Sequence, residues 1–192
     1  MQGDQENVAI VQEVAAVLDR LQVPYALGGS WASSLLGKPR LTHDAHMTVE
    51  LFPGKETPFC SSFSDDYYVS LPMIQDAIRR RSSFNIIHWP SGFKVDLFVR
   101  KDRPFDASVL ARRRSHPLSE GRSLTLVSPE DVILFKLEWY RLGGGTSERQ
   151  LEDVRGVFQV QAGKLDQAYL DDWAADLGVS DLLQRARQES GV

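Results

Sequence analysis

The stretch of sequence that decides the fold is YALGGSWASSLLGKPRLTHDAHMTVEL, residues 25–51. It begins with the apolar run Tyr25–Leu27, which predicts a short buried strand, and continues with a glycine pair. Ser30 then stands where a capping hydroxyl opens a helix, and we expect that helix over residues 31–36. The stretch therefore predicts a strand, a glycine turn and a helix in close succession.

The second half of this stretch alternates polar and apolar residues with a period of two, which predicts a half-buried strand from Asp44. His46 lies two positions further on, so both side chains point to the same face of that strand. The apolar residues that share the opposite face are Ala45, Met47, Val49 and Leu51.

Outside this stretch, helices and strands are mixed. Apolar spacing predicts an amphipathic helix over residues 8–21, and a helix, a short strand and a second helix between residues 55 and 82. Two strands around the turn 90–92 predict a hairpin, with Asp96 on the polar face of the second strand. Another hairpin is expected around residues 120–122.

The last third of the chain reads as helical. Ser128, Pro129 and the two acids that follow form a strong helix start. The helix then carries Lys136 among apolar residues, where a charge needs water or a partner. We expect an α/β core over residues 1–127 and a helical region over residues 128–192 packed on it.

Composition excludes several classes of protein. The chain has 192 residues, 42% of them hydrophobic, and a net charge of −4, as expected for an ordinary globular protein rather than a strongly basic nucleic-acid binder. The single cysteine excludes an internal disulfide. No apolar run reaches the roughly 20 residues of a membrane helix, and the opening residues lack signal-peptide features, so we expect a cytoplasmic protein.

The polar residues match the needs of phosphoryl and nucleotidyl transfer. Such chemistry needs carboxylates that hold metal ions, and donors that bind phosphate oxygens. Asp44 and His46 share one strand face, Asp96 lies on a later strand, and the glycine turn before a helix can offer backbone N–H groups to phosphates.

The order of these parts resembles the DNA polymerase β-type nucleotidyltransferase superfamily, and small bacterial members related to type IV toxin–antitoxin (abortive-infection) transferases in particular. The matching runs are residues 26–32 and 37–46, which follow a pattern of glycine pair, serine, helix and Arg-x-Thr-x-Asp-x-Asp. Residues 128–137 resemble the family's Pro-Glu-Asp helix, and residues 149–154 its Lys-Asp-x-x-Asp-Ile helix. The resemblance covers roughly residues 8–160.

This resemblance implies a nucleotidyltransferase fold, with a mixed β-sheet flanked by helices. It implies Mg²⁺ or Mn²⁺ held by Asp44, His46 and Asp96, the two aspartates being catalytic, and a nucleoside triphosphate as substrate. The acceptor is a protein, a tRNA or a small molecule, and an antitoxin is an implied partner. The residues that the resemblance assigns to nucleotide binding are Gly28, Gly29, Ser30, Arg40, Thr42 and Lys136.

Two positions depart from the family pattern. His46 replaces the second metal-binding aspartate, and Gln150 replaces an acid of the later helix. Mg²⁺ prefers oxygen ligands, whereas imidazole suits Mn²⁺, Zn²⁺ or Fe²⁺, so we predict weak or absent activity with Mg²⁺. The alternative is a catalytically inactive nucleotide- or partner-binding domain.

Simpler structural roles stand beside these assignments. The glycine pair and Ser30 can form a structural turn, and Asp96 can form a surface ion pair with Lys94 or Arg100. Lys136 can extend its ammonium group to water.

Overall fold

The computed structural model describes residues 2–118 and 123–191 as an α/β protein. The chain divides into two compact units. The first unit comprises the described residues up to Leu27 and from Thr42 to Leu126. The second comprises Gly28–Leu41 and the described residues from Val127 onward.

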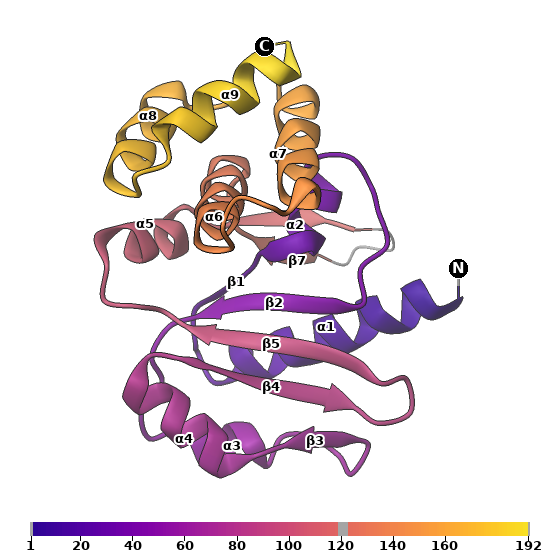
Figure 1. The fold of residues 1–192 in the computed structure, drawn as a ribbon. Coiled ribbons are helices and arrows are strands. Elements are labelled where there is room, and N and C mark those ends of the chain that lie inside the picture. Colours follow the sequence, from indigo (N-terminus) through magenta and orange to yellow (C-terminus); the bar gives the residue numbers. More distant parts are fainter. Residues whose placement is uncertain (1, 119–122, 192) are drawn as a thin grey trace. The chain divides into compact units, whose positions relative to one another are not determined.

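The first unit contains a mixed sheet whose seven described strands follow the order β3-β4-β5-β2-β1-β7-β6 (Figure 1). β2 and β5 are parallel neighbours, and β4 pairs antiparallel with β5. The strands are β1 (Tyr25–Leu27), β2 (Asp44–Val49), β3 (Tyr67–Val69), β4 (Ser83–His88), β5 (Phe93–Val99), β6 (Arg114–Pro117) and β7 (Ser123–Leu126).

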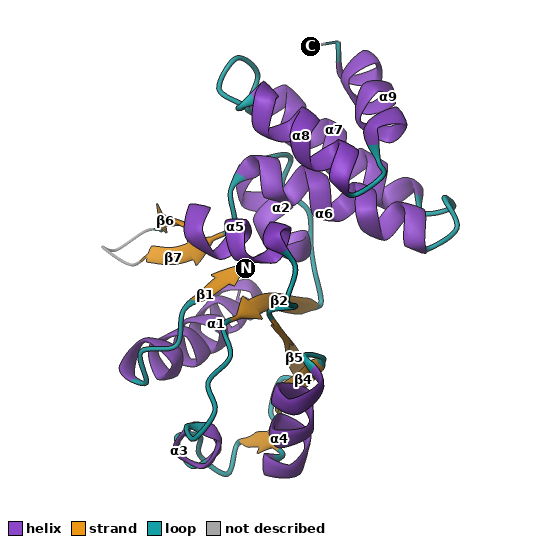
Figure 2. Ribbon diagram, turned by 90° about the vertical axis from the view of Figure 1, so that its left-hand side faces the viewer, coloured by secondary structure: helices purple, strands orange, loops and turns teal. Residues whose placement is uncertain are grey.

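The helices of this unit surround the sheet, and α1 lies beside β1 and β2 in both views (Figures 1 and 2). α1 begins at Gln2, six residues earlier than the apolar spacing predicts. The four helices described here are α1 (Gln2–Arg20), α3 (Glu56–Cys60), α4 (Leu71–Arg80) and α5 (Pro104–Arg112).

Alternation along β2 and β5 separates a core face from a polar face. Ala45, Met47 and Val49 are fully buried, as are Val95 and Leu97 of the neighbouring strand. Burying these side chains supplies the main stabilisation of the sheet, roughly 1.5–3 kcal/mol for each large aliphatic residue. The same alternation places Asp44, His46 and Asp96 together on the opposite face.

The two hairpin predictions have different outcomes. β4 and β5 pair antiparallel around a turn in which Gly92 has φ +69°, and this hairpin is confirmed. β6 and β7 also pair antiparallel, but the turn predicted around residues 120–122 lies outside the described residues.

The second unit is helical. Its helices are α2 (Gly29–Leu36), α6 (Pro129–Leu142), α7 (Glu148–Val160), α8 (Gln167–Asp176) and α9 (Ser180–Ser190). α2 packs against α6 and α7 (Figure 2). The cap at Ser128 is confirmed, because its Oγ accepts from the Asp131 N–H at 3.2 Å.

The capping role predicted for Ser30 is wrong. α2 begins at Gly29 with Gly28 at the cap position and no side-chain cap. Gly29 has φ +58°, a conformation that glycine adopts without steric cost, and the helix starts two residues earlier than expected. The Ser30 Oγ accepts instead from the Arg40 guanidinium.

None of the helices in the described part of the chain is long and apolar enough to cross a membrane.

Candidate functional site

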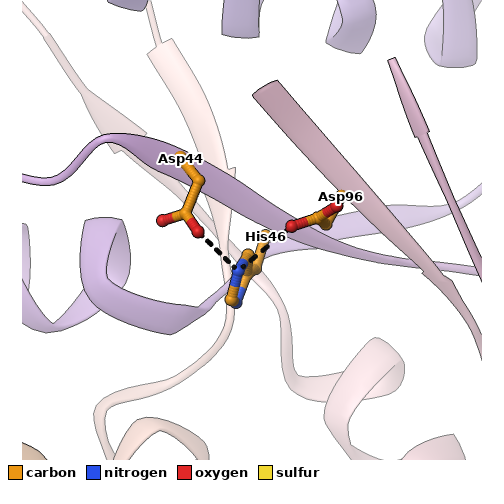
Figure 3. A group of neighbouring side chains, drawn as sticks. All are labelled: Asp44, His46 and Asp96. Carbon is orange, nitrogen blue, oxygen red and sulfur yellow. Dashed lines mark ion pairs between the residues drawn. The ribbon is translucent and has the colours of Figure 1, made fainter. Parts of the chain in front are cut away.

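The polar face of β2 and β5 carries a three-residue cluster that matches the predicted metal ligands (Figure 3). Parallel pairing places His46 directly beside Asp96, and Asp44 lies two residues earlier on β2. His46 Nε2 lies 3.3 Å from Asp44 Oδ2 and 3.5 Å from Asp96 Oδ2. One donor atom from each residue lies within 4.8 Å of the others, so a single cation can contact all three.

The cluster is partly open to solvent. The side chains of Asp44 and His46 are each 39% exposed, while that of Asp96 is 16% exposed. The rings of His46 and Phe98 pack edge to face, with their centroids 5.4 Å apart. This contact restricts the orientation of the imidazole between the two carboxylates.

Electrostatics within the cluster favour the protonated form of His46 and the ionised form of Asp96. The hydrogen bond with Asp96 raises the pKa of His46 above its ordinary value, with further help from Asp44, although burial opposes the rise. Burial alone would raise the pKa of Asp96, but hydrogen bonds with His46 and Lys94 hold it below its ordinary value. Asp96 therefore stays ionised at neutral pH.

Two neighbours support the carboxylates. Thr42 Oγ1 donates toward Asp44 Oδ1 at 3.3 Å and also lies 3.1 Å from the backbone carbonyl oxygen of Asp44. Lys94 Nζ lies 2.8 Å from Asp96 Oδ2, so the ion pair considered from the sequence is present with Lys94. Arg100 is not its partner, because that guanidinium binds Glu50 at 2.7 Å.

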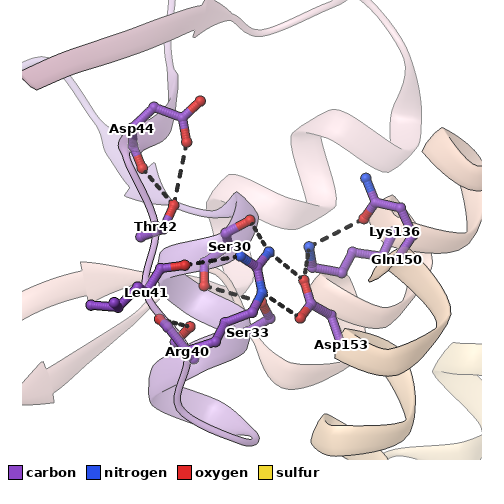
Figure 4. Close-up of polar contacts among 10 residues, drawn as sticks. Ser30, Ser33, Arg40, Leu41, Thr42, Asp44, Lys136, Gln150 and Asp153 are labelled. Carbon is purple, nitrogen blue, oxygen red and sulfur yellow. Dashed lines mark hydrogen bonds and ion pairs between the residues drawn. The ribbon is translucent and has the colours of Figure 1, made fainter. Parts of the chain in front are cut away.

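Arg40 and Lys136, both predicted to bind nucleotide, meet in the second unit at one carboxylate (Figure 4). Arg40 contacts both oxygens of Asp153, at 2.8 Å through Nε and 2.9 Å through Nη2. Lys136 Nζ lies 2.7 Å from Asp153 Oδ2 and 3.2 Å from Gln150 Oε1. We call this group, completed by Ser30, the Arg–Lys cluster.

Within the Arg–Lys cluster, Lys136 and Asp153 are buried, and both cations contact the Asp153 carboxylate. Burial alone would raise the pKa of Asp153, but hydrogen bonds from Arg40 and Lys136 hold it below its ordinary value. Burial lowers the pKa of Lys136, and the Asp153 carboxylate opposes that fall. The simple alternative for Lys136, an ammonium group extended to water, does not describe this structure, because its side chain is only 7% exposed.

Close helix packing fixes the segment that carries Arg40. A Cβ atom on Gly37 would lie 2.8 Å from both the Ser33 carbonyl oxygen and the Val157 nitrogen, so only glycine fits between α2 and α7. Gln161 Nε2 also donates to the Leu36 carbonyl at 2.7 Å. The turn after α2 is therefore held against α7, and this contact restricts the backbone of the segment that carries Arg40.

Two polar residues of these clusters were not assigned a role from the sequence. Asp153 lies in the run 149–154 that resembles the family helix, yet nothing in that run indicates which cations it would bind. Lys94 was considered only as an ion-pair partner of Asp96. Lys94 lies two residues before Asp96 on the same strand, and this spacing indicates that both side chains point to one face.

Comparison with known proteins gave matches at the level of structure alone. No protein-family model matches this chain. No curated protein matches it at a significant level.

Solved structures, in contrast, match over most of the chain. The solution structure of the antibiotic-resistance factor ANT(2″)-Ia has a TM-score of 0.54 at 13% identity, covering 97% of this chain and 98% of that one. An antigenic nucleotidyltransferase-like protein from Paracoccidioides brasiliensis has a TM-score of 0.54 at 20% identity, covering 92% of each chain. The chain has a nucleotidyltransferase fold.

A third match is ANT(2″)-Ia in complex with adenylyl-2″-tobramycin, with a TM-score of 0.51 at 14% identity, covering 88% of this chain and 95% of that one. These matches confirm the fold class expected from the sequence, a mixed sheet flanked by helices. The assignment of each site residue stays a prediction.

Proposed function

We propose that this chain is a metal-dependent nucleotidyltransferase, which transfers a nucleoside monophosphate from a nucleoside triphosphate to an acceptor. The observation that carries the proposal is the Asp44–His46–Asp96 cluster on the polar face of β2 and β5 in a nucleotidyltransferase fold. The resemblance of the sequence to the superfamily supports the same assignment independently.

The donor set of the cluster fits a divalent cation. Neighbouring ligands of one such ion, each about 2.1 Å from it, lie about 3 Å apart. The 3.3 and 3.5 Å separations from His46 Nε2 to the two aspartates are close to that spacing. One imidazole among two carboxylates favours Mn²⁺ or another transition-metal ion over Mg²⁺.

Once bound, such an ion would neutralise phosphate charge and orient the reacting groups. Asp44, held by Thr42, would present a fixed carboxylate to it. Asp96 would also orient the acceptor hydroxyl, because an ionised carboxylate accepts a hydrogen bond from it. Its lowered pKa makes Asp96 a weak base, so positioning would contribute more than proton removal.

The second unit would supply phosphate contacts. Gly28 and Gly29 begin α2, whose first N–H groups lack partners within the helix and suit anionic oxygens. Arg40 and Lys136 add two cations that share the Asp153 carboxylate. This pairing of a guanidinium with an ammonium group supports their assignment to triphosphate binding, with Ser30 beside Arg40.

The acceptor belongs to one of three classes: a protein side chain, a tRNA end or a small molecule. ANT(2″)-Ia, whose structure was solved with adenylyl-2″-tobramycin, makes a hydroxyl-bearing small molecule a reasonable first trial. The relation to toxin–antitoxin transferases, and hence an antitoxin partner, rests on the sequence resemblance alone.

A second candidate function is nucleotide or partner binding without turnover. Its support is the pairing of the carboxylates with the chain's own cations, since Asp96 contacts both Lys94 and His46. A site already neutralised in this way binds a metal ion less tightly than three carboxylates would.

Calorimetric nucleotide binding tests the proposal. ATP, GTP, CTP and UTP are titrated with Mg²⁺ and then with Mn²⁺ into the wild-type chain and a His46→Asp variant. We expect Mn²⁺-dependent binding by the wild-type chain and about a ten-fold gain in Mg²⁺-dependent affinity in the variant, because a third carboxylate restores charge and oxygen ligation.

The matched control is His43→Asp, which adds the same charge at an exposed position just before β2. This control should bind like the wild-type chain. If no protein binds any nucleotide with either metal ion, the nucleotidyltransferase proposal fails and partner binding becomes the working model.

A further inference from the structure

Lys94 lies inside the cluster rather than beside it. It stands two residues before Asp96 on β5, so both side chains point to the same face of the sheet. In the parallel register Lys94 is the direct partner of Asp44 on β2. Its Nζ lies 2.8 Å from Asp96 Oδ2, the oxygen that also faces His46.

The charges of these four residues differ from those of a three-carboxylate centre. Asp44 and Asp96 together carry two negative charges, and Lys94 adds one positive charge 2.8 Å from Asp96 Oδ2. A metal-bound imidazole is neutral, so with His46 as a ligand the group carries −1, whereas three aspartates without the lysine would carry −3. A charge of −3 suits two divalent ions beside a triphosphate, and a charge of −1 does not.

We propose that Lys94 belongs to the metal centre as a fixed cation in place of a second divalent ion, so that the centre takes one ion. The proposal rests on the proposed function, because it assigns a role within the same site. A lysine ammonium is a compact charge with three donors, and it binds carboxylate and phosphate oxygens alike. Without a ligand, Lys94 orients Asp96. When a triphosphate binds, its ammonium group can donate to a phosphate oxygen.

If Lys94 only formed a surface ion pair with Asp96, its removal would have a different effect on metal binding. Removing one partner of an exposed pair changes little beyond the pair itself. A cation built into a metal centre repels the ion held next to it, so its removal should tighten metal binding. The two roles are therefore separated by metal affinity and stoichiometry, without any measurement of activity.

The test is a titration of the folded chain with Mn²⁺ alone, with free Mn²⁺ followed by electron paramagnetic resonance. The variants are Lys94→Gln, which removes the charge, and Lys94→Arg, which keeps it. Lys101→Gln is the matched control, because Lys101 is an exposed lysine just beyond β5. An Asp44→Asn variant identifies binding at the cluster, and circular dichroism establishes that each variant is folded.

We expect one Mn²⁺ per wild-type chain. Lys94→Gln should bind it on the order of ten-fold more tightly, because one unit charge a few ångströms from a dication has about this effect even at high dielectric constant. Lys94→Arg and Lys101→Gln should bind like the wild-type chain, and Asp44→Asn should lose most of the affinity. The count should stay at one in equilibrium dialysis with a non-hydrolysable ATP analogue, after subtracting the analogue alone.

Two results would overturn the role of Lys94 and leave the metal site standing. One is a count of two Mn²⁺ per wild-type chain, both lost in Asp44→Asn. The other is an affinity of Lys94→Gln equal to that of Lys101→Gln while Asp44→Asn still loses binding. Absence of Mn²⁺ binding by every protein would instead overturn the metal centre itself, and with it both proposals.

Discussion

Removal of the Asp153 carboxylate should destabilise the protein severely, because this group is the shared partner of two cations in the Arg–Lys cluster. Its side chain is 6% exposed, and that of Lys136 is 7% exposed. In an Asp153→Ala variant Lys136 keeps only the neutral Gln150 oxygen at 3.2 Å. A buried ammonium without a counter-ion is costly, so the folded state loses free energy while the unfolded state does not.

The size of the effect follows from the two partners. Arg40 is 27% exposed, and it can turn toward water when its carboxylate is lost. Lys136 has no such route, and removing one partner of a buried pair costs about 3–5 kcal/mol. Loss of the lysine proton limits the cost, because deprotonating an ordinary lysine at pH 7 takes about 5 kcal/mol. We therefore expect a loss of about 3–5 kcal/mol in unfolding free energy.

The assay is urea unfolding at pH 7, followed by tryptophan fluorescence and circular dichroism on the same samples. Coincident transitions would justify a two-state treatment of a chain with two compact units. The control is Asp181→Ala, which removes the carboxylate of an exposed ion pair with Arg141 in the same unit. Its unfolding midpoint should stay close to that of the wild-type chain.

A double variant isolates the charge on Lys136 as the cause. Replacing Lys136 by Met in the Asp153→Ala background removes the unpaired ammonium at similar volume, and it should recover at least half of the lost stability. The reasoning fails if Asp153→Ala costs less than about 1 kcal/mol. It fails equally if the double variant is as unstable as the single one, since the loss would then not come from the lysine.

Two further predictions concern the same unit. The pKa of Asp153 is lower in the folded than in the unfolded chain, so its stabilisation is present above the unfolded value of about 4 and is lost as pH falls through the folded value. Urea unfolding from pH 6 down to pH 3 should show wild-type stability converging on that of Asp153→Asn below pH 4, and a constant gap would contradict this. Gly37→Ala should cost about 2–3 kcal/mol, because its Cβ meets backbone atoms at 2.8 Å. Gly163→Ala, which has φ +73° and open space, should cost only about 1 kcal/mol in the same assay, and equal losses would refute a steric cause.

The fold was predictable because its local signals agree with one another. The period of two along β2 reports a strand with one buried face, and the structure buries that face completely. The start signal at Ser128 reports a helix, and α6 begins there. The Ser30 cap was wrong because a glycine with positive φ can open a helix by itself, and the sequence gives no value of φ.

The contacts of the candidate site were only partly predictable. Strand alternation placed Asp44 and His46 on one face, but the register that brings Asp96 beside His46 depends on pairing between distant segments. Asp153 contacts Arg40 across 113 positions of sequence, so no local pattern reveals this pair. Lys94 was visible in the sequence, yet only its 2.8 Å contact makes it part of the charge of the site.

The two clusters differ in the sign of the charge that each gathers. On the sheet, two carboxylates are partly offset by Lys94 and His46, so the attraction for cations is reduced. Among the helices, Arg40 and Lys136 share the Asp153 carboxylate, so this cluster brings fixed cations together. A metal ion at the sheet cluster would then contribute less to triphosphate binding than it does with three carboxylates. Because fixed cations bind phosphates without supplying a metal's coordination chemistry, this balance favours nucleotide binding more than it favours rapid transfer.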